Sequence, residues 1–287
     1  FVSKQDEFSV IPGTPIAYWK SREIMKSFNS ENLDDKLVFR QGMTTTDNER
    51  YLRFWQEVSI DKIGFGITSR EKSILSGRKW FPYQKGGEFR KWYGNNYYVV
   101  FYLNDGQELI DLVTRKYPRI SDPEFIIKNR NWYFKEGLTW STLSSGTLGV
   151  RFGPSGFIFD AKGSMAFTKD GNTILPYIAL LNSKVAMDYL DVLSPTLDYN
   201  IVAIKVVPYL IEDTRLIEIL TKDNIEIAKE DWDSFETSWD FKEHPLIKWS
   251  KALWDATAIG ATMHYYYGGQ PKVNSPLELC YMLWQGE

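Results

Sequence analysis

The pattern of hydrophobic and polar positions changes period several times along the chain, which predicts a mixed α+β fold. Short runs rich in β-branched and aromatic residues, bounded by Gly, Ser or Asn, are typical of strands. Such runs occupy residues 37–40, 57–60, 97–102, 132–134, 150–152, 156–160 and 202–207. Helical spacing predicts helices over residues 21–28, 108–116, 174–193, 212–222 and 247–258. We therefore expect mixed, twisted β-sheets with packed helices over about residues 31–210, followed by a mainly helical extension.

Changes in local composition divide the chain into three parts. Residues 1–30 form a lead-in, with a turn sequence, Ile-Pro-Gly-Thr-Pro, at 11–15 and a short helix that Ser21 can cap. Residues 31–211 alternate between predicted strands, loops and helices and form the main domain. Residues 212–287 begin as an acidic helical segment and become rich in aromatic residues.

The composition is that of a folded protein that does not cross a membrane. The 287 residues are 43% hydrophobic and 25% charged, and no apolar run approaches the roughly 20 residues of a membrane-spanning helix. The chain begins Phe-Val-Ser-Lys, without an initiator Met or a signal-peptide pattern, so we expect a piece of a longer protein. A single cysteine, Cys280, excludes an internal disulfide and a multi-cysteine zinc site, and favours a cytoplasmic location.

Familiar catalytic patterns are missing from the sequence. It has no Gly-x-x-x-x-Gly-Lys-Ser/Thr, no Gly-x-Gly-x-x-Gly after a strand and no Gly-x-Ser-x-Gly. The two histidines, His244 and His264, are more typical of structural or surface positions. The carboxylates Asp231, Asp233 and Glu236 are more typical of a solvated helix face. We therefore expect no catalytic residue and no metal site in this chain.

Charge is distributed unevenly, although the formal net charge is only −3. Residues 70–91 carry seven bases and two acids, whereas residues 212–243 carry eleven acids and four bases. Within the basic region, residues 79–95 interleave bases with aromatic side chains around a Gly-Gly pair. Bases bind phosphate, aromatic rings stack on nucleobases and glycines permit close backbone approach, so the stretch predicts nucleic-acid binding. The candidate residues are Lys79, Lys85, Gly86, Gly87, Arg90, Lys91 and Trp92.

Two other interpretations of this basic stretch stay open. An aromatic core with its intervening charges facing water would give the same pattern. A carbohydrate-binding surface would also use exposed Trp and Tyr residues, although it would seldom need so many bases.

A second stretch, residues 40–50, places small hydrogen-bonding side chains in a Gly-containing loop. Such a loop can donate hydrogen bonds to phosphate or contact the edges of bases. The candidate residues are Arg40, Gln41, Gly42, Thr44, Thr46 and Asn48. A polar surface loop without a ligand would have a similar composition.

Several motifs, taken together and in order, carry a resemblance to a known family. They include Arg-Gln-Gly-Met-Thr-Thr-Thr-Asp-Asn-Glu-Arg-Tyr-Leu-Arg at 40–53, Gly-Leu-Thr-Trp-Ser at 137–141 and Gly-Val-Arg-Phe at 149–152. Further segments lie at residues 11–19, 80–95, 156–160, 181–185, 193–197 and 231–241. Through most of its length the chain resembles the large adenine-specific DNA methyltransferases of BREX phage-defence systems, the PglX family.

The resemblance implies the C-terminal part of a two-part enzyme. In that family, an N-terminal Rossmann-type domain with an Asn-Pro-Pro-Tyr motif binds S-adenosylmethionine and takes a flipped adenine. A C-terminal target-recognition domain, similar to restriction-modification specificity subunits, holds the DNA. This chain contains no Asn-Pro-Pro-Tyr, so it matches the recognition part, with residues 31–211 as the target-recognition domain. Two residues of the shared motifs, Ser141 and Arg151, join the candidate DNA-binding residues.

The resemblance also implies partners and a cofactor. The partners are double-stranded DNA, the catalytic domain of the same parent chain and other proteins of the defence system. S-adenosylmethionine is expected in the parent's catalytic domain, and no cofactor in this chain. Residues 247–287 depart from the family, because they are aromatic and Gly-containing instead of a long charged helix.

One alternative function belongs to a different class. The chain could be a protein-interaction module that scaffolds a defence complex through the acidic segment 212–243 and the aromatic residues that follow. A carbohydrate-binding domain is a weaker third option. Strongly salt-dependent binding to duplex DNA separates the first function from the other two, because phosphate contacts release counterions.

Overall fold

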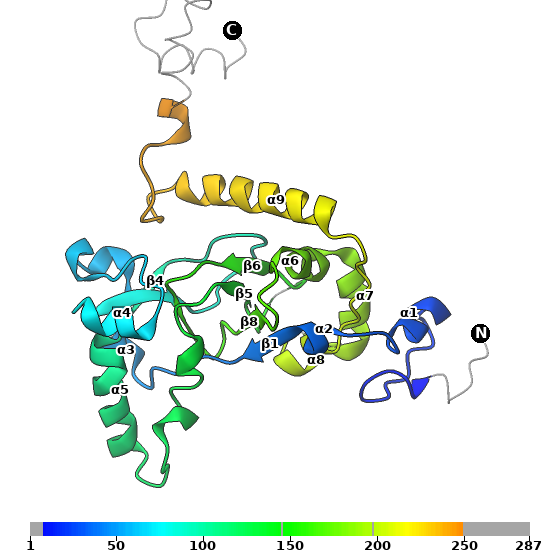
Figure 1. The fold of residues 1–287 in the computed structure, drawn as a ribbon, viewed down its shortest axis with the longest axis horizontal. Helices are drawn as coiled ribbons and strands as arrows, with labels where there is room; N and C mark the ends of the chain where they lie inside the picture. The colour runs from blue at the N-terminus through cyan, green and yellow to red at the C-terminus, as the bar shows by residue number, and fades with distance from the viewer. Residues whose placement is uncertain (1–7, 145, 197, 249–287) are drawn as a thin grey trace, which may run out of the picture. The chain divides into compact units, whose positions relative to one another are not determined.

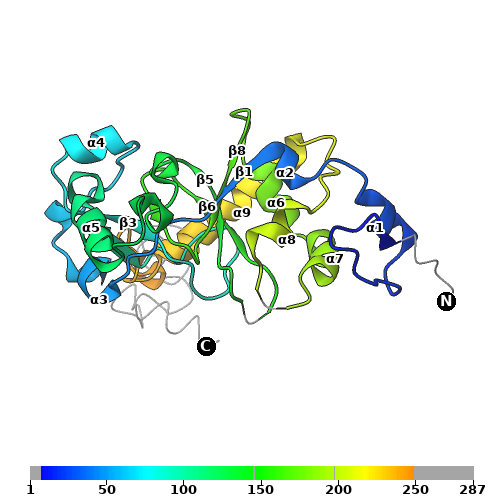
Figure 2. The same cartoon turned by 90° about the horizontal axis from the view of Figure 1, so that it is seen from below.

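The computed structural model describes residues 8–144, 146–196 and 198–248, and the structural statements below concern those residues. Contacts within the chain divide it into a large unit, residues 1–229, and a second unit, residues 230–287. The large unit contains two four-stranded β-sheets, around which its helices pack (Figures 1 and 2). The expected mixed α+β fold is therefore confirmed.

The first sheet has the strand order β1-β8-β5-β6, and its neighbouring strands are all antiparallel. Its strands are β1 (Leu37–Arg40), β5 (Gly137–Trp140), β6 (Val150–Gly153) and β8 (Met165–Thr168). Side chains alternate between the two faces of a strand. On one face, Leu138 and Trp140 join the core made with helices, and on the other face Met165 and Phe167 join the core of the second sheet. The first sheet thus lies between two hydrophobic cores.

The second sheet has the order β2-β4-β3-β7, in which β3 and β7 are parallel and the other neighbours antiparallel. Its strands are β2 (Leu52–Phe54), β3 (Trp80–Gln84), β4 (Tyr98–Phe101) and β7 (Ile158–Phe159). Leu109 and Val113 of helix α5 (Leu103–Lys116) complete its core. At the start of α5, residues 104–106 have left-handed φ values of 48°, 59° and 77°, so they form a turn before the predicted helix.

Several helices begin at side chains that accept hydrogen bonds from their first turns. Ser21 caps α1 (Arg22–Ser27), Ser183 caps α7 (Lys184–Leu193) and Asn200 caps α8 (Ile201–Lys205), and each cap satisfies a backbone N–H that lacks an intrahelical partner. The other helices are α2 (Leu33–Lys36), α3 (Asn48–Tyr51), α4 (Arg70–Leu75), α6 (Leu175–Asn182) and α9 (Arg215–Asp233). Short 3₁₀ turns occupy Trp55–Glu57, Ile60–Lys62, Pro123–Phe125 and Arg130–Trp132.

Two predicted strands are loops with 3₁₀ turns. Residues 57–60 lie between two such turns, and the Glu57 carboxylate accepts a hydrogen bond from the Phe54 N–H at 2.8 Å. Residues 132–134 close another turn, and Phe134 has a φ of +66° that a strand does not allow. Its N–H donates to the Phe157 carbonyl at 2.7 Å. Both strand assignments are wrong because local hydrogen bonds close these segments into turns.

The predicted strand at 202–207 is also wrong, because most of this segment forms helix α8. The Asn200 side chain accepts a hydrogen bond from the Ala203 N–H at 3.1 Å. Ala203, Ile204 and Val207 then lie on one buried face against the first core, so packing outweighs the strand preference of β-branched residues. The predicted helix at 174–193 is two helices, α6 and α7, which meet at Ser183.

The C-terminal predictions are confirmed only in part. The helix expected at 212–222 is α9, which begins at Arg215 and continues to Asp233. The helix expected at 247–258 lies almost entirely outside the described residues. Within the described part of the chain, no helix has both the length and the apolar character needed to cross a bilayer.

A buried side chain, Asn182, attaches the helical layer to the first sheet. It ends α6, and its Oδ1 accepts a hydrogen bond from the Val150 N–H at 3.0 Å while its Nδ2 donates to the Val150 carbonyl at 2.9 Å. We expect Asn182→Ala to lower the free energy of unfolding by about 1–3 kcal/mol, because it leaves the buried Val150 N–H without a partner, while the Val150 carbonyl keeps the Trp92 N–H. Urea denaturation measures this loss. Asn172→Ala, at an exposed position, is the control, and equal effects of the two variants would contradict the attachment.

Candidate nucleic-acid interface

The two stretches singled out by the sequence meet at residues 160–163, which we call the Asp160 turn. The Met43 N–H donates to the Phe159 carbonyl at 3.0 Å, and the Ala161 N–H donates back to the Met43 carbonyl at 3.0 Å. On the other side, the Asp160 N–H donates to the Gln84 carbonyl at 2.9 Å. The loop that follows β1 and the segment that follows β3 are therefore fixed next to each other by the backbone after β7.

Glycines allow these backbones to approach closely. A Cβ on Gly42 would lie 1.9 Å from the Phe159 carbonyl oxygen, closer than any real contact. Gly86 is buried and has a φ of +87°, and a Cβ there would lie 3.1 Å from the Lys162 carbonyl oxygen. Gly87, with a φ of +130°, is exposed. Gly42 and Gly86 thus join the chain's own segments, whereas Gly87 faces solvent.

The Asp160 carboxylate organises the centre of this arrangement. It accepts hydrogen bonds from the Tyr83 hydroxyl at 2.8 Å and from the Lys162 N–H at 2.7 Å. The ammonium of Lys85 lies 3.6 Å away. Burial raises the pKa of Tyr83 well above its ordinary value, and the negative charge of Asp160 raises it further. Tyr83 therefore stays protonated and donates to Asp160 at neutral pH.

Basic side chains surround the loop that contains Gln41. Lys128 donates to the Gln41 Oε1 at 3.0 Å, while the Gln41 Nε2 lies 3.4 Å from the Ala161 carbonyl. The Arg40 guanidinium lies 5.2 Å from the centre of the Trp132 ring, and the Lys135 ammonium lies 4.6 Å from the same ring. Both are distances at which cations are attracted to aromatic faces. The loop thus presents exposed Gln41 among several cations.

Sequence reasoning missed three residues of this site, namely Lys128, Asp160 and Lys162. Lys128 lies in an irregular segment and reaches Gln41 across 87 positions of sequence, a separation at which no local pattern links the two. Lys162 is exposed in the turn, and its Asp-Ala-Lys-Gly sequence is the one local signal that could have indicated a turn.

The second half of the 40–50 loop contacts a different part of the unit. The Thr44 N–H donates to the Ile126 carbonyl at 3.1 Å, and the Thr46 carbonyl accepts from Lys116, at the end of α5, at 3.1 Å. The Asn48 Oδ1 accepts a hydrogen bond from the Thr45 hydroxyl. Thr44 and Asn48 are nevertheless exposed and can meet a ligand from outside.

The remaining bases of the basic-aromatic stretch do not gather at the Asp160 turn. Lys79 precedes β3, and at about 3.3 Å per residue it lies about 20 Å from Lys85. Trp92 runs beside β6, where its N–H donates to the Val150 carbonyl at 2.8 Å. Lys91 donates to the Asn182 carbonyl at 2.8 Å, so its ammonium contacts helix α6. Of the seven candidates in this stretch, Lys85, Gly86 and Gly87 are thus the ones next to the turn.

The last two candidates, Ser141 and Arg151, have buried polar atoms without a hydrogen-bond partner among the described residues. Arg151 is 1% exposed, and within the described residues its Nε and Nη2 have no hydrogen-bond partner. Burial lowers the pKa of Arg151 to about 10, and the positive charge of Arg90 acts in the same direction. The buried Ser141 Oγ likewise has no hydrogen-bond partner among the described residues.

In amino-acid sequence, the chain is similar to adenine-specific methyltransferases. The chain is 39% identical over 247 residues to the adenine-specific methyltransferase PglX of Lacticaseibacillus casei strain Zhang. It is 37% identical over 248 residues to the adenine-specific methyltransferase BrxX of Escherichia coli O9:H4 strain HS. No family model matches the chain.

These matches cover much of this chain but little of its relatives. Each covers 85% of the chain, which spans 20% of the Lacticaseibacillus protein and 19% of the Escherichia protein. The chain therefore corresponds to a partial region of proteins of this kind, about a fifth of their length. To this extent the resemblance seen in the sequence is confirmed.

The close approach at Gly42 gives a direct test of how the loop is held. We expect Gly42→Ala to lower the free energy of unfolding by about 1–3 kcal/mol, because the added Cβ meets a backbone carbonyl that has little freedom to shift. Gly146→Ala is the matched control, since a Cβ at Gly146 meets nothing within 4 Å. Chemical denaturation of both variants decides the matter. A stable Gly42→Ala protein would show that Phe159 does not hold the loop.

Proposed function

We propose that this chain is the DNA-recognition region of an adenine-specific DNA methyltransferase that acts in bacterial phage defence in the cytoplasm. It belongs to the C-terminal part of the parent enzyme and holds duplex DNA for a separate catalytic domain. That domain binds S-adenosylmethionine and transfers the methyl group. The similarity to adenine-specific methyltransferases supports this proposal.

The observation that carries the proposal is the set of cations around the Asp160 turn. Arg40, Lys85, Lys128 and Lys162 come from four separate segments and lie beside one exposed polar loop. Basic side chains position a protein on phosphates, whereas exposed amides and hydroxyls contact base edges. In this role the four bases bind the DNA backbone, while Gln41 and Thr44 contact bases.

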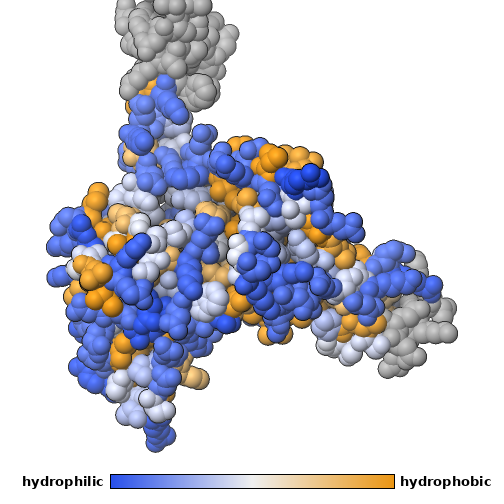
Figure 3. All heavy atoms as spheres, in the orientation of Figure 1, coloured by the Kyte–Doolittle hydropathy of each residue, from blue (hydrophilic) through white to orange (hydrophobic). Residues whose placement is uncertain are grey.

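A protein-interaction module is the second candidate function, and helix α9 favours it. Its side chains Leu216, Ile219, Leu220 and Ile227 are 52–66% exposed, and Figure 3 shows apolar side chains along this helix among hydrophilic ones. An exposed apolar stripe on an acidic helix is typical of a protein contact. This function is compatible with DNA binding at the Asp160 turn, because the two use different residues of the chain.

The DNA-binding proposal predicts different behaviour for two lysines at opposite ends of β3. We expect Lys85→Ala and Lys162→Ala to weaken binding to all duplexes and to lower the salt slope by about one each, because each removes a phosphate contact. Lys79→Ala, about 20 Å from Lys85, should change neither quantity. Fluorescence anisotropy with specific and random duplexes at two salt concentrations measures both. Equal losses in Lys79→Ala and Lys85→Ala would contradict the placement of the interface.

The proposed contact between Gln41 and a base predicts a loss of binding that depends on the DNA sequence. We expect Gln41→Ala to cost about 1–3 kcal/mol of binding free energy on the preferred duplex and far less on random DNA. The same anisotropy measurement serves here. A uniform loss on all duplexes would assign Gln41 to the backbone instead of the bases.

If DNA recognition and catalysis belong to separate domains, as proposed, this chain alone transfers no methyl group. We expect no incorporation of labelled methyl groups from S-adenosylmethionine into DNA, because the sequence has no Asn-Pro-Pro-Tyr motif to hold a flipped adenine. Calorimetry should likewise detect no binding of the cofactor. Methylation by the isolated chain would overturn the division into catalytic and recognition parts.

A further inference from the structure

A fully buried arginine without a counter-ion is an unusual feature in a folded protein. Arg151 of β6 pairs with Thr139 of β5, and its side chain lies on the face of the sheet opposite to Trp140 and Val150. Among the described residues, no carboxylate forms an ion pair with it and no group bonds its Nε or Nη2. Its pKa of about 10 keeps it charged at neutral pH.

Two partly buried arginines of the unit, by contrast, have a carboxylate partner. Arg130 and Arg70 both pair with the Asp105 carboxylate, which is itself largely buried. Taking an ion out of water costs several kcal/mol, and a partner of opposite charge offsets that cost. Arg151 instead has a second cation, Arg90, as its neighbour, and burial together with the charge of Arg90 lowers the pKa of Arg151. The free protein therefore holds a buried positive charge that an incoming anion would neutralise.

A second unpartnered donor lies on the same face of the sheet. Ser141 follows Thr139 by two residues, so both project to the side of Arg151. Its buried Oγ has no partner among the described residues and lies 3.4 Å from the position of a Cβ on Gly86. Gly149, two residues before Arg151, lies against the Arg90 backbone and the Phe89 ring. The segment 86–90 thus covers the face that carries Ser141 and Arg151.

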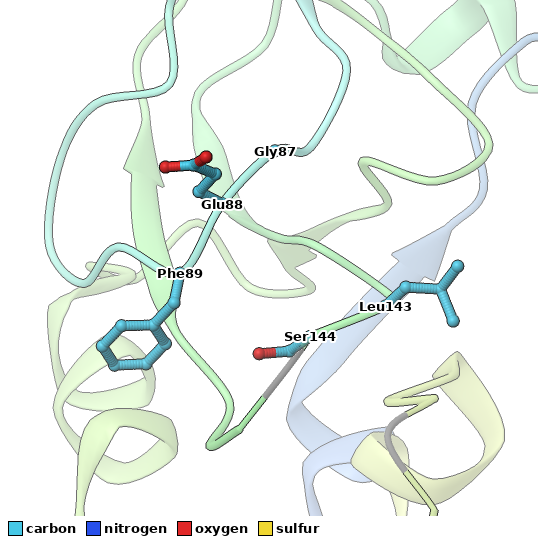
Figure 4. Close-up of a pocket in the computed structure, with 5 residues that line it drawn as sticks. All are labelled: Gly87, Glu88, Phe89, Leu143 and Ser144. Atoms are coloured by element: carbon cyan, nitrogen blue, oxygen red, sulfur yellow. The ribbon is translucent and has the colours of Figure 1, made fainter.

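A pocket opens at the edge of this covering segment. It has a volume of about 570 Å³ and is lined by Gly87, Glu88, Phe89, Leu143 and Ser144. Figure 4 shows that the two lining loops face each other, and that the Glu88 carboxylate points away from Ser144. Leu143 comes two residues after Ser141, so the pocket and the unpartnered hydroxyl belong to the same short segment of the chain.

We propose that Arg151 and Ser141 form a recessed anion site that takes one backbone phosphate of the bound DNA. A phosphodiester offers two oxygens to the guanidinium and a third contact to the serine hydroxyl, which matches the unused donors. The choice of DNA as the source of the phosphate rests on the proposed function, and the nearby Arg90 and Lys85 favour it over a carboxylate of a protein. Gly86 and Gly87 carry no side chains, so these two positions of the covering segment permit close approach of a phosphate.

The test compares Arg151→Met with Arg130→Met in the full chain. Without phosphate, Arg151→Met should melt at the same temperature as the wild type or higher, because it removes an unpaired buried charge. Arg130→Met should melt lower, because it leaves Asp105 with one partner fewer. Inorganic phosphate, added at constant ionic strength, should raise the melting temperature of the wild type and of Arg130→Met but not of Arg151→Met. Melting of Arg151→Met below the wild type, with an intact phosphate response, would overturn the proposal.

Duplex binding separates the failure of this site from the failure of the proposed function. Arg151→Met should bind all duplexes about ten- to a hundredfold more weakly, as expected for the loss of a charged hydrogen-bonded contact. If Lys85→Ala weakens binding and Arg151→Met does not, the DNA-binding function stands and the anion site is rejected. If the wild type binds inorganic phosphate through Arg151 but does not bind duplex DNA, then DNA is rejected as the source of the phosphate that this site takes.

Two milder variants keep the test valid if Arg151→Met does not fold. Arg151→Lys retains the charge but loses the two-pronged geometry, and Ser141→Ala removes only the hydroxyl. Both should fold, and both should reduce the response to inorganic phosphate severalfold. An undiminished response in both would overturn the assignment of these donors.

Discussion

The hydrogen bonds of the Asp160 carboxylate hold together the place where the chain passes from one sheet to the other. Strand β7 ends at Phe159 in the second sheet, and β8 begins at Met165 in the first. Between them, the carboxylate accepts from the Tyr83 hydroxyl and the Lys162 N–H. A nearly buried carboxylate needs such donors, because an unpartnered charge is costly. The ends of β3 and β7 and the loop after β1 therefore keep one fixed arrangement, and the candidate cations keep theirs.

Strand β8, which follows the Asp160 turn, contributes side chains to both hydrophobic cores of the large unit. Ala166 packs into the helical core, while Met165 and Phe167 pack into the core of the second sheet. A shift of one residue in its pairing would exchange these two faces. The sheets, the helical layer and the Asp160 turn thus depend on a single register.

The sequence predicted those elements whose signals are local. The strands at residues 37–40, 97–102 and 150–152 and the cap at Ser21 are confirmed. Strand β5 went unrecognised because all four of its residues are buried, so no alternation of polar and apolar positions marks it. The segment at 202–207 was assigned wrongly because β-branched residues also occur in buried helices.

The candidate site, too, could be predicted from the sequence only where the signal is local. Residue types and spacing selected Gln41 and Lys85, but their meeting at the Asp160 turn depends on contacts that join distant segments. The missing partners of Arg151 are likewise a property of the folded environment, since an arginine in a short strand looks ordinary in a sequence.

In the loop after β1, the backbone at Gly42 is held in place, whereas the side chain of Gln41 can be replaced. Gly42 holds the backbone against Phe159, whereas the neighbouring Gln41 side chain is exposed. In the proposed role, a change of target sequence requires only new side chains at exposed positions, on a backbone that stays the same. In that role, related chains can differ in the DNA sequences that they recognise while they retain one scaffold.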